Sequence, residues 1–146
     1  MSTVRVQAED FDPAAELAAL ERLGGGAVAS FTGIVRADGG LIELVLEHYP
    51  AMTGAALRAI VAEAERRWPL LGVTVIHRQG ALRVGERIVF VATASANRAA
   101  ALESCTFLID WLKTRAPFWK YERRADGTGR WVEARDADED AAARWG

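Results

Sequence analysis

Several short segments of the chain alternate apolar and polar residues or concentrate branched apolar ones. Thr3–Gln7 and Leu41–His48 alternate with a period of two, which places one face of a strand on a core. Val73–His77 and Arg87–Ser95 read as two further strands. Ala27–Val35 is a run of small and branched apolar residues, which predicts a largely buried strand.

A spacing of three to four residues between apolar positions predicts two longer helices. The first lies between Met52 and Trp68 and is stopped by Pro69. The second is capped by Asn97 or Ser95 and ends near Arg115, just before Ala116-Pro117. Their apolar faces consist of Leu57, Ile60, Val61, Ala64 and Trp68 in the first helix, and of Ala101, Cys105, Leu108, Ile109 and Leu112 in the second.

Cap and turn signals complete the pattern. Asp12-Pro13 starts a helix that runs to about Arg22, and the acidic stretch Asp136–Glu139 opens a last short helix. Phe118–Arg124 and Gly129–Ala134 form a hairpin around Asp126-Gly127. This order of strands and helices, with hairpin-like neighbours, predicts one α+β domain over residues 1–146, with a mixed or antiparallel sheet.

The composition argues against several classes of function. The 18 Lys+Arg nearly balance 20 Asp+Glu, so there is no basic excess of the kind that nucleic-acid or membrane-surface proteins carry. No apolar run approaches the roughly 20 residues that cross a bilayer and the first residues do not resemble a signal peptide, so we expect a cytoplasmic protein. Cys105 is the only cysteine, and His48 and His77 are each embedded in a strand. We therefore expect no internal disulfide and no metal site.

The segment Lys113–Glu122 concentrates cations and aromatic rings where a helix is followed by a strand. Lys113 and Lys120 could converge on one pocket, where charge would hold an anion and Phe118 or Trp119 would contact a flat ring. Alternatively, Lys113 only favours a helix C-terminus and Lys120 lies on an exposed hairpin face. The residue types alone leave both interpretations open.

Three arginines are further candidates for anion binding. Arg36 leaves the strand Ala27–Val35, and Arg98 begins a helix, where backbone N–H groups also attract phosphate. Arg135 follows a predicted strand, and Glu122 lies two residues beyond Lys120. Each has an ordinary structural alternative, namely a solvated strand end, a surface arginine in a first helical turn, or a salt bridge within the hairpin.

Six blocks, in order along nearly the whole chain, resemble the large subunits of molybdopterin synthase, the MoaE family. The most distinctive are LEHYP and KTRAPFWK, which are long and unusual in composition. The blocks are Leu46–Pro50 with Met52-Thr53, Arg67–Leu70, Val73–Arg78, Ile88–Val91, Lys113–Lys120 and Trp131–Arg135.

The resemblance implies an α/β hammerhead-type fold and a homodimer of large subunits. A small ubiquitin-like carrier subunit would dock at each end and make a heterotetramer. The carrier's C-terminal Gly-Gly thiocarboxylate would enter a pocket and deliver sulfur twice to cyclic pyranopterin monophosphate, building the molybdopterin dithiolene. Such a sulfurtransferase requires no metal or organic cofactor.

The resemblance also implies roles for particular residues. In similar proteins the arginine at the position of Arg135 comes from the other subunit, and Glu122 lies close to an acidic position. Lys113 and Lys120 match the catalytic lysines, while Phe31, Arg36, Asn97, Arg98 and Arg135 match positions of the substrate and carrier-tail pocket.

Two departures from the family pattern bear on function. Asn97 stands where relatives commonly have a histidine and cannot become charged, and the loop Ala37–Gly40 looks shorter than usual. These differences leave an alternative open: a non-catalytic dimeric module that binds a ubiquitin-like tail or a phosphorylated ligand. An RNA-binding domain is disfavoured by the net acidic charge.

Overall fold

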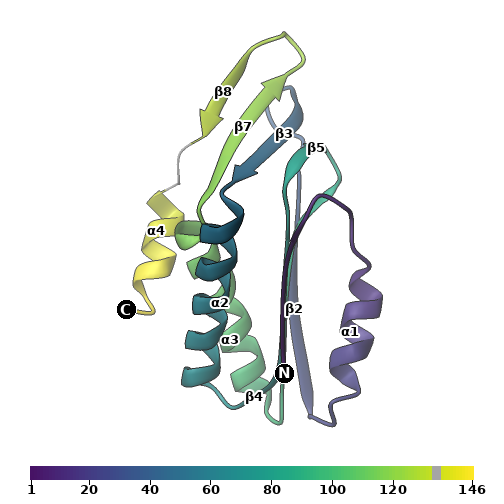
Figure 1. Cartoon of the computed structure of the whole chain (residues 1–146), viewed down its shortest axis with the longest axis vertical. Helices are drawn as coiled ribbons and strands as arrows, with labels where there is room; N and C mark the ends of the chain where they lie inside the picture. Colours follow the sequence, from purple (N-terminus) through teal and green to yellow (C-terminus); the bar gives the residue numbers. More distant parts are fainter. Residues whose placement is uncertain (133–135) are drawn as a thin grey trace.

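The computed structural model describes residues 1–132 and 136–146, without the side chains of residues 136 and 137. Eight strands and four helices lie in this part of the chain (Figure 1). In chain order they are β1 (Ser2–Gln7), α1 (Pro13–Glu21), β2 (Ala27–Ile34), β3 (Leu41–His48), α2 (Pro50–Arg67), β4 (Leu70–Arg78), β5 (Gly80–Arg83), β6 (Arg87–Ser95), α3 (Arg98–Arg115), β7 (Phe118–Arg124), β8 (Gly129–Val132) and α4 (Asp136–Ala143).

The first sheet has the strand order β1-β4-β6-β2, in which β1 runs parallel to β4 and the other pairs are antiparallel. Helices α2 and α3 lie side by side on one face and α1 covers the other (Figure 1). The alternating side chains of β4 and β6 feed both cores, as with Val75 toward α2 and α3 and Ile76 toward α1. Because both faces are covered, β4 and β6 are buried over most of their length.

The second sheet has the order β5-β3-β7-β8 and extends from one end of the first (Figure 1). All of its described pairings are antiparallel. Its inner face buries Leu46 and Leu82 against Val35, which follows β2. This second core joins the two sheets, and it lies next to the point where α3 passes into β7.

Most element boundaries follow the predicted caps and breakers. The Asp12 side chain accepts a hydrogen bond from the Ala14 amide at the start of α1. Helix α2 starts at Pro50, two residues before the predicted Met52. Asn97 caps α3, because its Oδ1 accepts a hydrogen bond of 2.8 Å from the Ala100 amide. The predicted helices and the α+β class are confirmed, as is the hairpin over Phe118–Arg124 and Gly129–Val132. Glu133 and Ala134, the end of its predicted second strand, lie outside the described residues.

One prediction about a strand was wrong, and one strand was not predicted. The segment Ala27–Val35 is not largely buried, because β2 is an edge strand of the first sheet and exposes Ser30, Phe31 and Ile34. The connection Gly80–Glu86 contains β5, a four-residue strand that pairs with β3. Both depend on which distant strand lies alongside, and local pattern does not reveal this.

The last helix is attached to α2 and α3 by an aromatic contact and polar bonds. Trp145 packs edge-on against Trp68 and Phe107, and its indole N–H donates to Asp110 at 2.8 Å. Arg67 donates to the Trp145 carbonyl at 2.7 Å. None of the helices in the described residues has the length and apolar character needed to span a membrane.

The cap of α3 gives a first prediction. Asn97→Ala is expected to lower the free energy of unfolding by about 1 kcal/mol, because the Ala100 amide loses its acceptor. Urea unfolding followed by circular dichroism measures this loss. Asn97→Asp keeps a capping oxygen and should lose much less; equal losses in the two variants would mean that the cap is not the cause.

Candidate active site

Lys113 and Lys120 flank the passage from α3 to β7. Lys113 is in the last turn of α3, and Phe118 begins β7 after Ala116-Pro117. The β3–β7 register pairs Phe118 with His48 and Lys120 with Leu46. We call the group formed by Lys113, Lys120, His77, Phe118 and His48 the lysine cluster.

The Phe118 ring links three strands within this cluster. It stacks on the His77 ring of β4, with ring centroids 3.8 Å apart and planes 15° apart. It also contacts the His48 ring of β3, at a centroid distance of 5.5 Å. Since β4 belongs to the first sheet and β3 and β7 to the second, Phe118 holds the two sheets together beside the lysines.

His77 is a buried, neutral imidazole that responds to both lysines. Burial lowers the pKa of His77 to about 3, against a hydrogen bond of 2.8 Å between Nδ1 and the Arg78 carbonyl that favours the charged form. The positive charges of Lys120 and Lys113 lower this pKa further, as does His48 to a smaller extent. Both lysines therefore lie within electrostatic reach of the same ring, as convergence on one site requires.

The second histidine of the cluster is oriented by Thr53. The Thr53 hydroxyl is fully buried and donates to the Tyr49 carbonyl at 2.9 Å. Its proton is used in that bond, so its oxygen accepts from Nδ1 of His48 at 3.1 Å. This fixes the orientation of the ring that contacts Phe118.

Phe31 lies beside the middle of α3 and not at the Lys113 end. Strand β2 pairs Ala27 with Ser95, near the start of α3, and Ile34 with Arg87, so it runs toward the C-terminal end of the helix. Phe31 lines a hollow of about 230 Å³ between β2 and α3, together with Ala29, Ser30, Leu102, Cys105, Thr106 and Ile109. Arg36, an exposed residue, follows β2 in the same direction.

Cys105 in this hollow is unsuited to nucleophilic chemistry. Burial raises the pKa of its thiol to about 11. At neutral pH it therefore remains a thiol, and the thiolate is the reactive form. This agrees with the interpretation of Cys105 as a packing residue.

Asn97 and Arg98 lie at the opposite end of α3 from Lys113. Arg98 and Lys113 are the first residue and a last-turn residue of the same helix, so a rise of 1.5 Å per residue separates them by about 22 Å along its axis. No side chain spans that distance. Within one chain the structure therefore does not bring Asn97 and Arg98 together with the two lysines. The predicted site residue Arg135 lies outside the described residues.

Glu122 takes part in a network of ion pairs. Its Oε1 accepts from Nη2 of Arg124 at 3.0 Å and from Nε of Arg130 at 3.3 Å. The structural alternative considered for Glu122, a salt bridge within the hairpin, is therefore what the structure contains.

Comparison with known proteins identifies the family. The chain matches the family described as MoaE protein over residues 6–115. The chain belongs to the MoaE family. A molybdopterin synthase catalytic subunit from Mesorhizobium japonicum is 57% identical, over 98% of this chain and 92% of the relative. One from Pseudomonas aeruginosa is 54% identical, over 97% of each chain.

Solved structures of the MoaE family have the same fold. The MoaE protein of Burkholderia ambifaria superposes with a TM-score of 0.85 at 49% identity, covering 99% of this chain and 98% of that one. A molybdopterin synthase structure from Staphylococcus aureus gives a TM-score of 0.77 at 28% identity, covering 88% and 95%. The resemblance inferred from the sequence blocks is confirmed.

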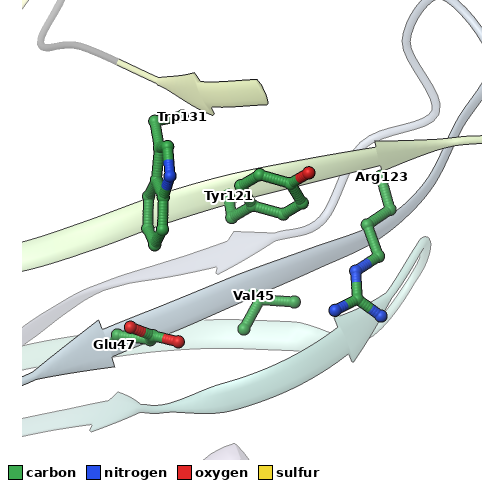
Figure 2. A pocket seen from close by; sticks show the side chains of 5 residues that line it. All are labelled: Val45, Glu47, Tyr121, Arg123 and Trp131. Atoms are coloured by element: carbon green, nitrogen blue, oxygen red, sulfur yellow. The ribbon is translucent and has the colours of Figure 1, made fainter. Parts of the chain in front are cut away.

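The second sheet of this MoaE-family chain also has an exposed aromatic face. Figure 2 shows Trp131 and Tyr121 beside one another above Val45, with Glu47 and Arg123 at the two ends of a hollow of about 240 Å³. The two rings meet edge to face at 5.1 Å. Neighbouring residues of β7 alternate between faces, so Lys120 and Phe118 lie on the other side of the sheet. Neither this hollow nor the one beside Phe31 is lined by Lys113 or Lys120.

The sequence predicts that His48 and His77 are hydrogen-bonded strand histidines, and the structure agrees. The sequence does not reveal that both rings contact Phe118. The pairing of His48 with Phe118 depends on the β3–β7 register, and the His77–Phe118 stack depends on how the two sheets meet. The only local signal was that His48 and Phe118 each adjoin a proline turn.

Proposed function

We propose that this chain is the catalytic subunit of a molybdopterin synthase and that Lys113 and Lys120 act on its substrates. The reaction transfers sulfur from a thiocarboxylated carrier subunit to cyclic pyranopterin monophosphate and forms the dithiolene of molybdopterin. The observation that supports the assignment of the lysines is their position on either side of Phe118, whose ring stacks on buried His77. The relatives named molybdopterin synthase catalytic subunits support the reaction.

The lysine cluster suits this chemistry because both reactants are anions. A phosphate and a thiocarboxylate each gain from nearby ammonium groups, and attack by the sulfur concentrates negative charge further. The stacked His77 is neutral and adds no positive charge to the cluster. A lysine can also donate or remove a proton when neighbouring cations lower its pKa. No metal or organic cofactor enters this proposal.

The site is proposed to be shared between two copies of the chain. Arg98 is too far from Lys113 in its own chain, so it would serve the lysines of the other protomer in a homodimer. We assign Asn97 and Arg135 to the same shared pocket. Arg36 follows Val35, which packs near Phe118, and would contact the substrate phosphate. Phe31, beside the middle of α3, would contact the entering carrier tail. One carrier at each end makes a heterotetramer, which we place in the cytoplasm.

Mixing two inactive variants tests this arrangement. Lys113→Ala and Arg98→Ala subunits are refolded together in equal amounts and assayed with thiocarboxylated carrier and pterin precursor. Random pairing makes half of the dimers mixed, and one of the two sites in each mixed dimer has both residues intact. The mixture should therefore regain about one quarter of the wild-type activity.

The controls separate this result from its alternatives. Each variant refolded alone should stay inactive, and a Lys113→Ala plus Lys120→Ala mixture should not recover, because both lysines belong to the same chain's site. Absence of recovery in the first mixture would contradict a shared site. A wild-type protein that binds the carrier but forms no dithiolene would instead identify a binding module.

A further inference from the structure

The loop between β2 and β3 is fastened to the β7–β8 hairpin by one arginine. Nη1 of Arg124 donates to the carbonyl of Asp38 at 3.1 Å and to that of Gly39. Nη2 of the same guanidinium donates to Glu122 at 3.0 Å. A backbone bond from the Ala125 amide to the Gly40 carbonyl at 2.9 Å reinforces the attachment, and one from the Leu41 amide to the Asp38 carbonyl at 3.0 Å closes the loop itself.

The loop is shaped around this guanidinium. Gly39 has a φ of +55°, and a Cβ at this position would lie 2.8 Å from Nη1 of Arg124. The guanidinium thus occupies the space that a side chain would need. The side chains of Arg124 and Glu122 are only 22% and 17% exposed, so this ion pair is better shielded than a solvated surface contact.

The fastened loop lies next to Arg36. On the other side of Arg36, the Val35 side chain is buried and its backbone is bonded at both ends, from the Val35 amide to Glu86 at 2.9 Å and from the Gly85 amide to Val35 at 2.7 Å. Arg36 is therefore an exposed cation whose backbone is anchored before and after it.

We propose that Glu122 and Arg124 are positioning residues, which hold the loop 37–40 against the hairpin and so keep Arg36 in place for the substrate anion. Glu122 orients the guanidinium of Arg124. In this orientation the guanidinium donates hydrogen bonds to the carbonyls of Asp38 and Gly39. The inference rests on the proposed function for the anion that Arg36 binds. It also gives Glu122, a candidate site residue, the role of holding Arg124 in position.

Arg124→Lys tests the inference, because lysine keeps the charge but lacks a planar fork with two branches. We expect the KM for cyclic pyranopterin monophosphate to rise about tenfold, as when one or two charge-assisted hydrogen bonds are lost. The value of kcat should change by less than about twofold, since the lysine cluster is untouched. Hydrogen exchange of the Leu41 and Ala125 amides should become faster. Glu122→Gln should shift KM and exchange in the same direction.

The matched control is Arg123→Lys, on the adjacent residue of β7. Arg123 pairs with Glu43 at 3.3 Å, whereas the loop carbonyl of Asp38 is bonded by Arg124. This variant should keep the wild-type KM and the wild-type exchange of both amides. A similar change in both variants would point to general loosening of the hairpin and overturn the inference.

Two further outcomes separate the inference from the proposed function. Faster exchange in Arg124→Lys with an unchanged KM would overturn the positioning role and leave the enzyme assignment standing. Unchanged exchange in both Arg124→Lys and Glu122→Gln would overturn it as well. Arg36→Ala is measured alongside, and wild-type kinetics in that variant would refute the anion-binding role of Arg36 itself.

Discussion

Replacing Lys113 with alanine is expected to abolish dithiolene formation while the fold and carrier binding remain largely intact. Lys113 is an exposed residue of the last turn of α3, so its removal costs little packing. Loss of a positioned proton donor or acceptor typically costs about 10²- to 10⁴-fold in rate, and loss of its charge adds to this. A reconstituted assay with thiocarboxylated carrier measures the product, and titration calorimetry measures carrier binding.

Two substitutions sharpen this prediction. Lys113→Arg keeps the charge but cannot give up a proton, so it distinguishes electrostatic from acid–base catalysis. Arg115→Ala removes a cation two residues away whose guanidinium lies 3.5 Å from the Trp111 ring centroid. That variant should retain activity. Full activity in Lys113→Ala would refute the assignment of the lysine.

Much of the fold could be predicted because its signals are local. Asp12 and Asn97 set helix starts through caps, and the Ala116-Pro117 pair ends α3. The edge position of β2 and the existence of β5 could not be predicted. They depend on partners far away in the sequence, β6 for the first and β3 for the second.

In the candidate site too, features with a local sequence signal could be predicted and features that depend on distant segments could not, with one exception. The position of Lys113 in the last turn of α3 and of Lys120 on the following strand could be predicted from the helix end at Ala116-Pro117. The stack of Phe118 on His77 could not, since it requires knowing how two sheets meet. The separation of Arg98 from Lys113, however, follows from the predicted helix alone, because helical rise puts them about 22 Å apart.

Burial of a neutral histidine beside two lysines has a thermodynamic consequence. The unfolded chain takes up a proton on His77 near pH 6.5, whereas burial holds the folded pKa at about 3. Above pH 6.5 the ring is neutral in both states and its titration does not affect stability. As the pH falls from about 6.5 toward 3, only the unfolded state gains the proton, so stability falls across that window.

The wild-type protein is therefore expected to lose about 2 kcal/mol of unfolding free energy through His77 between pH 7 and pH 5. Glu63, Glu86 and Asp126 also have lowered pKa values in the folded chain. They are carboxyl groups, however, and the stability that they contribute is lost mainly at lower pH, below their ordinary values. Urea unfolding at the two pH values measures the difference.

His77→Phe isolates this effect. A phenyl ring can still stack on Phe118 but does not titrate, so about 2 kcal/mol of the pH dependence should disappear. The variant also loses the hydrogen bond to the Arg78 carbonyl, but that loss is the same at both pH values and cancels in the comparison. An equal loss of stability in the variant and the wild type would show that His77 is not the titrating group. The interpretation of His77 as a buried, neutral ring beside Lys113 and Lys120 would then be wrong.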